Sequence, residues 1–151
     1  MDAREPRVEG IEYADYAQRV KGAIIDFFLV GIVALILIFG FSVFASRGGP
    51  AARIFIGLAY AVSYFGSTAY YTVCVAEGGQ TLGKMSVHTA VRLDGAEDTS
   101  LGYIRALGRA LVPTFLWLFL IPGLLDVLWP FWDRKHQTLH DKLVGSVVIR
   151  V

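Results

Sequence analysis

Residues 19–45 read R-V-K-G-A-I-I-D-F-F-L-V-G-I-V-A-L-I-L-I-F-G-F-S-V-F-A, and this stretch decides the fold. No charged residue occurs from Phe27 to Ala45, so the run is apolar and long enough to cross a bilayer as a helix. Asp26 stands near its start. A carboxylate at the centre of such a helix costs roughly 2.5–3.5 kcal/mol and is usually kept for a partner, a proton or an ion. Arg19 lies too far along the helix to pair with it, so we expect Asp26 to meet a group from elsewhere in the fold.

The composition indicates a membrane protein. Of the 151 residues, 55% are hydrophobic and 18% are charged, with a formal net charge of +1. This balance is more apolar than a soluble domain of this length would carry, and it shows no basic field for nucleic acid. Residues 1–12 lack the basic start and short apolar core of a secretory signal, so we expect the first apolar run to be retained.

Two spans are expected, one over residues 22–44 and one over residues 54–76. The segment between them, residues 46–50, contains Ser, two Gly and Pro, and therefore predicts a tight turn and an antiparallel hairpin. Residues 86–93 and 145–151 read as short strands, with a turn at Asp94-Gly95 after the first. Because a lone short strand leaves its backbone unpaired, we expect these two strands to pair with each other on one side of the membrane.

The third apolar region, residues 111–132, contains Pro113, Pro122-Gly123 and Pro130. We favour two half-helices broken near Pro122-Gly123 that enter and leave on one face, with a single kinked span as the rival. The excess of Lys and Arg in the N-terminal segment, the middle segment and the tail also favours a cytoplasmic location for all three. Residues 101–112 predict an amphipathic helix in the cytoplasmic interface. Its Arg105 and Arg109 either reach lipid phosphates or join a polar cluster.

The expected fold is therefore an all-α membrane protein in a single domain over residues 1–151. It comprises a two-span helical hairpin, an amphipathic interfacial helix, a broken or re-entrant helical segment and a small cytoplasmic two-stranded β element. Several polar residues are candidates for a site around Asp26. Tyr64 and Ser67 lie on one stripe of the second span, Lys84 is expected at the headgroups or beside a carboxylate, and Asp126 interrupts the third apolar region. His140 and Asp141 are adjacent near the tail.

Neither a metal site nor a catalytic centre is expected from these residues. The histidines match no metal-ligand spacing, no nucleophile arrangement is apparent, and the single Cys74 lies inside a span. We therefore expect no cofactor and no enzymatic activity.

Four motifs in order resemble the RDD family of small bacterial membrane proteins, named for one Arg and two Asp. Residues 16–26 resemble its first motif, with Arg19 and Asp26. The central motif, G-Q-T-L-G-K, occupies residues 79–84, and R-A-L-G-R occupies residues 105–109. The closing motif begins at Gln137 and includes Asp141 as the second aspartate. The resemblance implies a multi-pass protein of the bacterial inner membrane in which Arg19, Asp26 and Asp141 matter. Transport, including cation/proton exchange, has been suggested for this family.

Two functions follow from these observations. In the first, the protein is transport-related and Asp26 binds a proton or cation, within a homo-oligomer or larger membrane complex. In the second, it is a non-catalytic accessory or assembly subunit packed against a larger membrane complex, and Arg19, Asp26 and Asp141 form a structural polar cluster. The sequence leaves these two alternatives open, as it does the ion, the partner and the oligomeric state.

Overall fold

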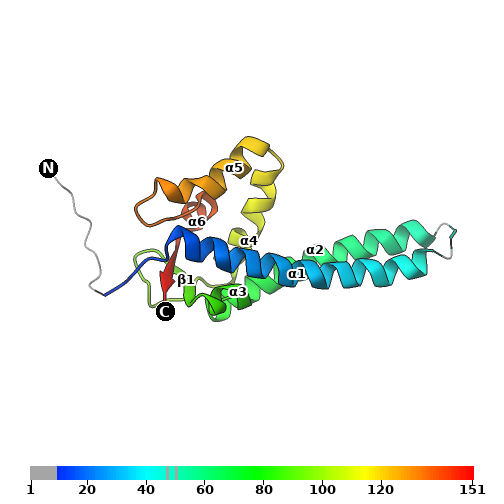
Figure 1. Ribbon diagram of the computed structural model, residues 1–151, viewed down its shortest axis with the longest axis horizontal. Coiled ribbons are helices and arrows are strands. Elements are labelled where there is room, and N and C mark those ends of the chain that lie inside the picture. The colour runs from blue at the N-terminus through cyan, green and yellow to red at the C-terminus, as the bar shows by residue number, and fades with distance from the viewer. Residues whose placement is uncertain (1–9, 47, 50) are drawn as a thin grey trace.

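The computed structural model describes residues 10–46, 48–49 and 51–151. The described chain is mostly helical and carries one small antiparallel sheet (Figure 1). Its elements in chain order are α1 (Tyr16–Ala45), α2 (Ala51–Glu77), α3 (Leu82–Ser86), β1 (Thr89–Leu93), α4 (Tyr103–Trp117), α5 (Leu120–Leu128), the 3-10 helix η1 (Trp129–Phe131), α6 (Leu139–Val144) and β2 (Ser146–Arg150).

Helices α1 and α2 form a long antiparallel pair (Figure 1). Helix α1 begins at a capping box in which the Asp15 side chain accepts a hydrogen bond from the Gln18 backbone N–H. Of the helices in the described part of the chain, α1 alone is both long enough and apolar enough to cross a membrane. Helix α2 has 27 residues, but its Tyr, Ser and Thr residues lower its hydropathy, so the second span remains a prediction. Arg47 and Pro50 of the predicted turn lie outside the described residues.

The two predicted strands pair with each other, as the sequence indicated. Thr89 lies opposite Arg150 and Leu93 lies opposite Ser146 in an antiparallel register. Strand β1 begins three residues later than predicted, because α3 occupies the chain as far as Ser86. On the other edge of β2, the Ala14 backbone N–H donates to the Val148 carbonyl oxygen at 2.9 Å.

The buried apolar core lies around this sheet, at the end of the helix pair where α1 begins and α2 ends. Its members are Ala14, Val75, Ala76, Val91, Leu101, Ala106 and Val148. The core is small for a chain of this length, whereas many large apolar side chains of α1, α2, α4 and α5 are exposed. Such a surface requires an apolar environment or a partner.

The third apolar region differs from the prediction in two ways. The predicted interfacial helix and the first half-helix are one continuous helix, α4, which contains Pro113. The break falls at Leu118 and Phe119 rather than at Pro122-Gly123. Pro122 is tolerated in the first turn of α5 because backbone N–H groups there have no partner within the helix. Gly123 instead provides room, since a Cβ atom at this position would lie 2.7 Å from the ring of Trp117.

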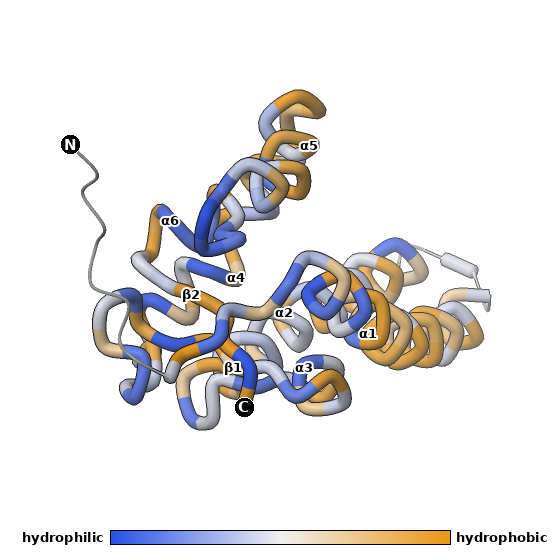
Figure 2. Tube along the Cα trace, turned by 60° about the vertical axis from the view of Figure 1, so that its left-hand side comes forward, coloured by the Kyte–Doolittle hydropathy of each residue, from blue (hydrophilic) through white to orange (hydrophobic). Residues whose placement is uncertain are grey.

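Helices α4 and α5 form a second hairpin, which projects to the side of the α1/α2 pair (Figure 1). The view in Figure 2 also shows this hairpin directed away from the long axis of the pair, with hydrophobic residues along α5. Side chains near its tip are strongly exposed, including Leu118 at 70% and Ile121 at 72%. The hairpin returns the chain to the end of the pair from which it left, and this is why β2 can reach β1.

Candidate functional site

Asp26 is buried where α1, α2 and α3 meet, and its side chain faces protein groups. The residue is 1% exposed. Its carboxylate oxygen Oδ1 accepts hydrogen bonds from the Gly83 backbone N–H at 2.8 Å and from the Tyr70 hydroxyl at 3.2 Å. The other oxygen, Oδ2, accepts a hydrogen bond from the Thr81 hydroxyl. The expectation that Asp26 meets partners from distant parts of the chain is therefore correct, and those partners are neutral donors.

Two glycines allow α3 to approach Asp26 closely. A Cβ atom at Gly83 would lie 2.7 Å from the Asp26 side-chain carbon Cγ, closer than such atoms can approach. On α1, a Cβ atom at Gly22 would lie 3.2 Å from the Gly83 carbonyl oxygen. These glycines let the backbones of α1 and α3 come into contact, so the Gly83 N–H reaches the carboxylate. Tyr70 extends the cluster, since its hydroxyl also accepts from the Leu82 backbone N–H at 2.9 Å.

A second buried carboxylate, Asp141, binds two arginines. Asp141 is fully buried at the start of α6. Its oxygen Oδ1 accepts from Arg109 Nε on α4 at 2.8 Å, and its oxygen Oδ2 accepts from Arg19 on α1. The Ser146 hydroxyl donates to Oδ1 at 3.0 Å, and the Thr138 backbone N–H donates to Oδ2 at 3.2 Å within a capping box. This centre therefore ties α1, α4, α6 and β2 together.

The arginines decide the charge state of Asp141. Burial by itself raises the pKa of this carboxyl, but the positive charges of Arg109 and Arg19 lower it, and the net pKa lies well below the usual 3.8. Asp141 is therefore ionised at neutral pH. Both arginine side chains are nearly buried, at 10% exposed for Arg19 and 12% for Arg109. A pair of this kind is costly to break, because removing one partner leaves an uncompensated buried charge.

His140 connects the Asp141 centre to the α4/α5 hairpin. Its ring nitrogen Nδ1 lies 2.7 Å from Asp126 Oδ2 on α5, and its backbone N–H donates to Asp126 Oδ1 at 2.8 Å. The other ring nitrogen, Nε2, lies 3.8 Å from Asp141 Oδ1. Asp126 is itself 2% exposed. This buried carboxylate therefore anchors α5 to α6.

Lys84, half-buried on α3, feels the charges of both centres. Burial, followed by the positive charge of Arg109, lowers the pKa of Lys84 to about 8, against an opposing effect of Asp26. Arg19 lowers this pKa further and Asp141 raises it. The pKa of Lys84 therefore responds to charges from both acidic centres.

The structure unites some of the predicted site residues and separates others. Arg19, Asp141 and His140 lie together and are joined by Arg109, so of the two alternatives for Arg109 the structure shows the polar cluster. Asp26 belongs to a separate cluster. Tyr64 and Ser67 are not among its hydrogen-bond partners, and the Ser67 hydroxyl instead donates to the Tyr64 carbonyl oxygen of its own helix at 2.8 Å. Arg105 joins neither centre, since the structure shows no side-chain hydrogen bond or ion pair from it to any described residue.

The partners of Asp26 could not be recognised from the sequence pattern. Tyr70 lies near the end of the second apolar run, where tyrosine is common at a membrane interface, so it does not stand out as a partner of Asp26. Thr81 and Gly83 lie in the central motif at residues 79–84. The position of that motif directly after the second apolar run was the available signal, because it places Thr81 near the membrane end at which Asp26 lies. Within residues 10–46, 48–49 and 51–151, no cluster of three or more His, Cys, Asp or Glu side chains is suited to hold a metal ion.

The fold combines a long apolar helix, a second helix paired with it, and a polar cap that consists of α3, α6 and the sheet and is held by buried carboxylates. These features define a membrane-associated helical protein. The chain belongs to the RDD family, whose family model matches residues 13–145. This match covers Asp26 with its three partners and Asp141 with both arginines, and it ends one residue before Ser146. Comparison with curated proteins and with solved structures finds no match.

Proposed function

We propose that the chain is a multi-pass protein of the bacterial inner membrane in which α1 and α2 cross the bilayer. The sheet and α6 then lie on the cytoplasmic side, together with the N-terminal segment. Among the described residues, the Lys and Arg of residues 19–21, 84–109 and 134–150 belong to elements at this end of the molecule, which supports this orientation under the positive-inside rule. The α4/α5 hairpin projects sideways from the same end (Figure 1), which supports insertion of its apolar side chains into one leaflet without a crossing.

Within this arrangement, we propose that the protein acts as a non-catalytic accessory or assembly subunit of a larger membrane complex. One observation carries this proposal: protein donors already engage each carboxylate oxygen of Asp26 and Asp141. A carboxylate whose two oxygens already accept hydrogen bonds from several segments holds the fold together and offers few free acceptor positions to an ion. What the chain offers to its surroundings is apolar helical surface, including Phe39 at 73% exposed and Phe65 at 68% exposed.

Native extraction tests the accessory role. The tagged protein is taken from its own membrane into polymer-bounded lipid discs without detergent, and the mass of the particle is measured. We expect a heterologous protein at fixed stoichiometry. We also expect that truncation of an exposed apolar side chain abolishes binding of that protein while the chain stays folded. The variants are Phe39→Ala, Phe65→Ala and Ile121→Ala. Recovery of only monomers or homo-oligomers from discs that retain all other native complexes would refute the role.

The transport role remains as a second candidate because of one cavity. A space of about 150 Å³ lies between α1 and α2, and Ser63, Ser67 and Tyr70 form part of its lining. The Ser63 hydroxyl is buried there without a hydrogen-bond partner among the described residues. Tyr70 then connects this space to Asp26 through its hydroxyl. A proton or cation entering between the helices would reach the carboxylate by this route.

Flux through reconstituted liposomes tests this second candidate. Cation-dependent proton movement should be present in the wild type and strongly reduced in Asp26→Asn. Because Asp26→Asn also weakens the fold, Tyr70→Phe is the matched variant: it removes only the hydroxyl between the cavity and the carboxylate. Absence of wild-type flux, or equal flux in all three proteins, would exclude Asp26 as a transport site.

A further inference from the structure

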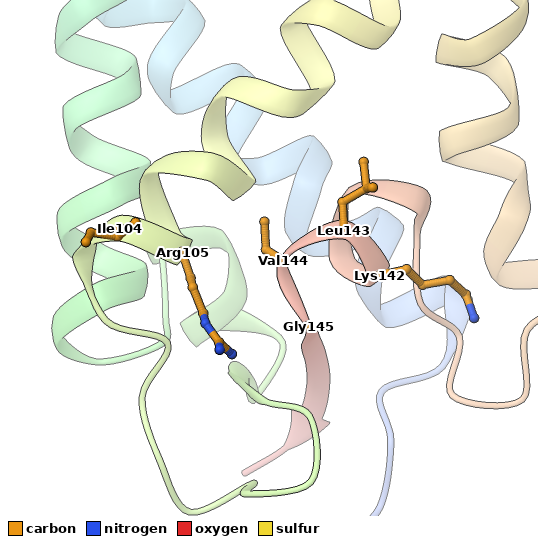
Figure 3. A pocket seen from close by; sticks show the side chains of 6 residues that line it. All are labelled: Ile104, Arg105, Lys142, Leu143, Val144 and Gly145. Atoms are coloured by element: carbon orange, nitrogen blue, oxygen red, sulfur yellow. The ribbon is translucent and has the colours of Figure 1, made fainter.

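A large open pocket lies where the start of α4 meets the end of α6, beside the Asp141 centre but lined by none of the residues that form it. Its volume is about 530 Å³, and it is lined by Ile104, Arg105, Lys142, Leu143, Val144 and Gly145 (Figure 3). The transport and accessory roles make no use of this pocket. Its lining combines positive charge with aliphatic side chains, and no acidic residue contributes to it.

Arg105 supplies the available positive charge. Arg109, one helical turn further along α4, is turned inward and paired with Asp141. The Arg105 side chain is directed into the pocket and lies beside Gly145, where a Cβ atom would stand 3.6 Å from Arg105 Nη1. Within the part of the chain that the structure describes, no carboxylate binds this guanidinium. Lys142 extends away from it (Figure 3) and pairs with Asp133. A planar guanidinium left open in this way suits the oxygens of a phosphate.

Aliphatic side chains accompany this charge on the same surface. Ile104 is 89% exposed and Leu143 is 68% exposed, both unusually high for side chains of this size. In the view of Figure 3, the Leu143 and Val144 side chains are directed upward, whereas the Arg105 side chain is directed downward from α4. The pocket therefore has an apolar side and a cationic side. A phospholipid in the cytoplasmic leaflet has the same division between its acyl chain and its phosphate.

We infer that this pocket binds an anionic phospholipid, with its phosphate on Arg105 and its acyl chain along Leu143 and Val144. The inference rests on the membrane location proposed above and is independent of the accessory and transport roles. The lipid would occupy the corner between α4 and α6, close to the ion pair between Arg109 and Asp141 that joins these two helices. It would thus hold the polar cap at a defined position on the cytoplasmic leaflet.

Lipid titration of the purified, delipidated full-length chain tests this inference. Phosphatidylglycerol and phosphatidylcholine are added separately, and bound lipids are counted by native mass spectrometry while thermal unfolding is followed. We expect the wild type to prefer phosphatidylglycerol and Arg105→Gln to lose roughly fivefold in its affinity, the factor for one basic side chain at a membrane surface. The matched control is Arg134→Gln, which removes the same charge from an exposed residue outside the pocket and should change the affinity by less than about twofold.

Two further arms identify the ligand. Leu143→Ser should weaken phosphatidylglycerol binding, because it removes the contact with the acyl chain while leaving Arg105 in place. Inorganic phosphate alone should not stabilise the wild type. The inference fails if Arg105→Gln and Arg134→Gln lose affinity equally, since attraction would then depend only on net charge. It also fails if free phosphate stabilises the protein through Arg105 as well as the lipid does.

Discussion

Arg19 and Asp141 lie 122 positions apart in the sequence and form a buried ion pair that joins the start of α1 to α6. Asp141 also binds Arg109, so one carboxylate neutralises guanidinium groups from two helices. The described chain thus closes into a ring, in which the first helix is connected to the last one. The α4/α5 hairpin lies within that ring and is held by the neighbouring contact between His140 and Asp126.

Removal of the Asp141 charge should be strongly destabilising. Asp141→Asn leaves Arg19 and Arg109 buried without a counter-charge, and we expect the free energy of unfolding to fall by about 3–5 kcal/mol. Denaturant unfolding of the purified protein in detergent measures the change. The control, Asp98→Asn, alters an exposed carboxylate and should stay within about 0.5 kcal/mol of the wild type. Equal stability of the two variants would show that the ion pair does not hold the fold.

The same residue should give the protein an acid-sensitive stability. Because the pKa of folded Asp141 lies below its ordinary value of 3.8, the ionised form stabilises the fold. The contribution is complete above the unfolded pKa and is lost as the pH falls from there through the lower, folded pKa. We expect the unfolding free energy to decline below about pH 4 and Asp141→Asn to flatten that decline. Part of the slope should remain from Asp15, whose pKa the Gln18 backbone N–H lowers.

Lys84 should oppose folding at neutral pH. Its pKa is lowered to about 8, chiefly by burial and then by Arg109, so its charged form is less favourable in the folded state. Lys84→Met should therefore stabilise the protein by roughly 1–3 kcal/mol at pH 7. The gain should shrink as the pH rises from about 8 and disappear above 10.5, where the amine is neutral in the unfolded chain as well. Thermal unfolding at several pH values checks this, with exposed Lys21→Met as a control that should change little.

Close contact between α1 and α3 should depend on Gly83. Gly83→Ala places a methyl group 2.7 Å from the Asp26 side-chain carbon Cγ, so α3 must move and its hydrogen bond to Asp26 is weakened. We expect a loss of about 1–3 kcal/mol in the free energy of unfolding. Gly31→Ala on α1 meets no atom within 4 Å and should stabilise the helix by about 0.5–1 kcal/mol. A loss of similar size in both variants would contradict the proposed contact.

Attachment of α5 should depend on Asp126. In Asp126→Asn the contact with the His140 ring loses its charge, and the hairpin should open more often without global unfolding. Hydrogen exchange followed by mass spectrometry should show faster exchange in α5 and unchanged exchange in the first half of α2. Unchanged protection of α5 would mean that the apolar contacts of Trp117 with Gly123 suffice to hold the hairpin.

Much of the secondary structure could be predicted because its signals are local. The apolar run after Asp26 gives α1, and the two short β-rich segments give the paired strands, since each pattern depends on neighbouring residues. The predicted break at Pro122-Gly123 was wrong because proline is excluded from the interior of a helix but not from its first turn. Here the contact between Gly123 and the Trp117 ring, which closes the α4/α5 hairpin, was not visible from sequence spacing.

The sequence by itself determined that this protein has a long apolar helix with an acidic residue near its N-terminal end, and that it belongs with RDD-type chains. Only the tertiary structure decided which partners that residue has. Tyr70, Thr81 and Gly83 lie 44 to 57 positions from Asp26, and Asp141 lies with Arg19 instead. The physical reason is that a buried carboxylate accepts hydrogen bonds from the donors that tertiary packing brings near it. That packing depends on glycine contacts and helix crossings between distant segments, which a local sequence pattern does not show.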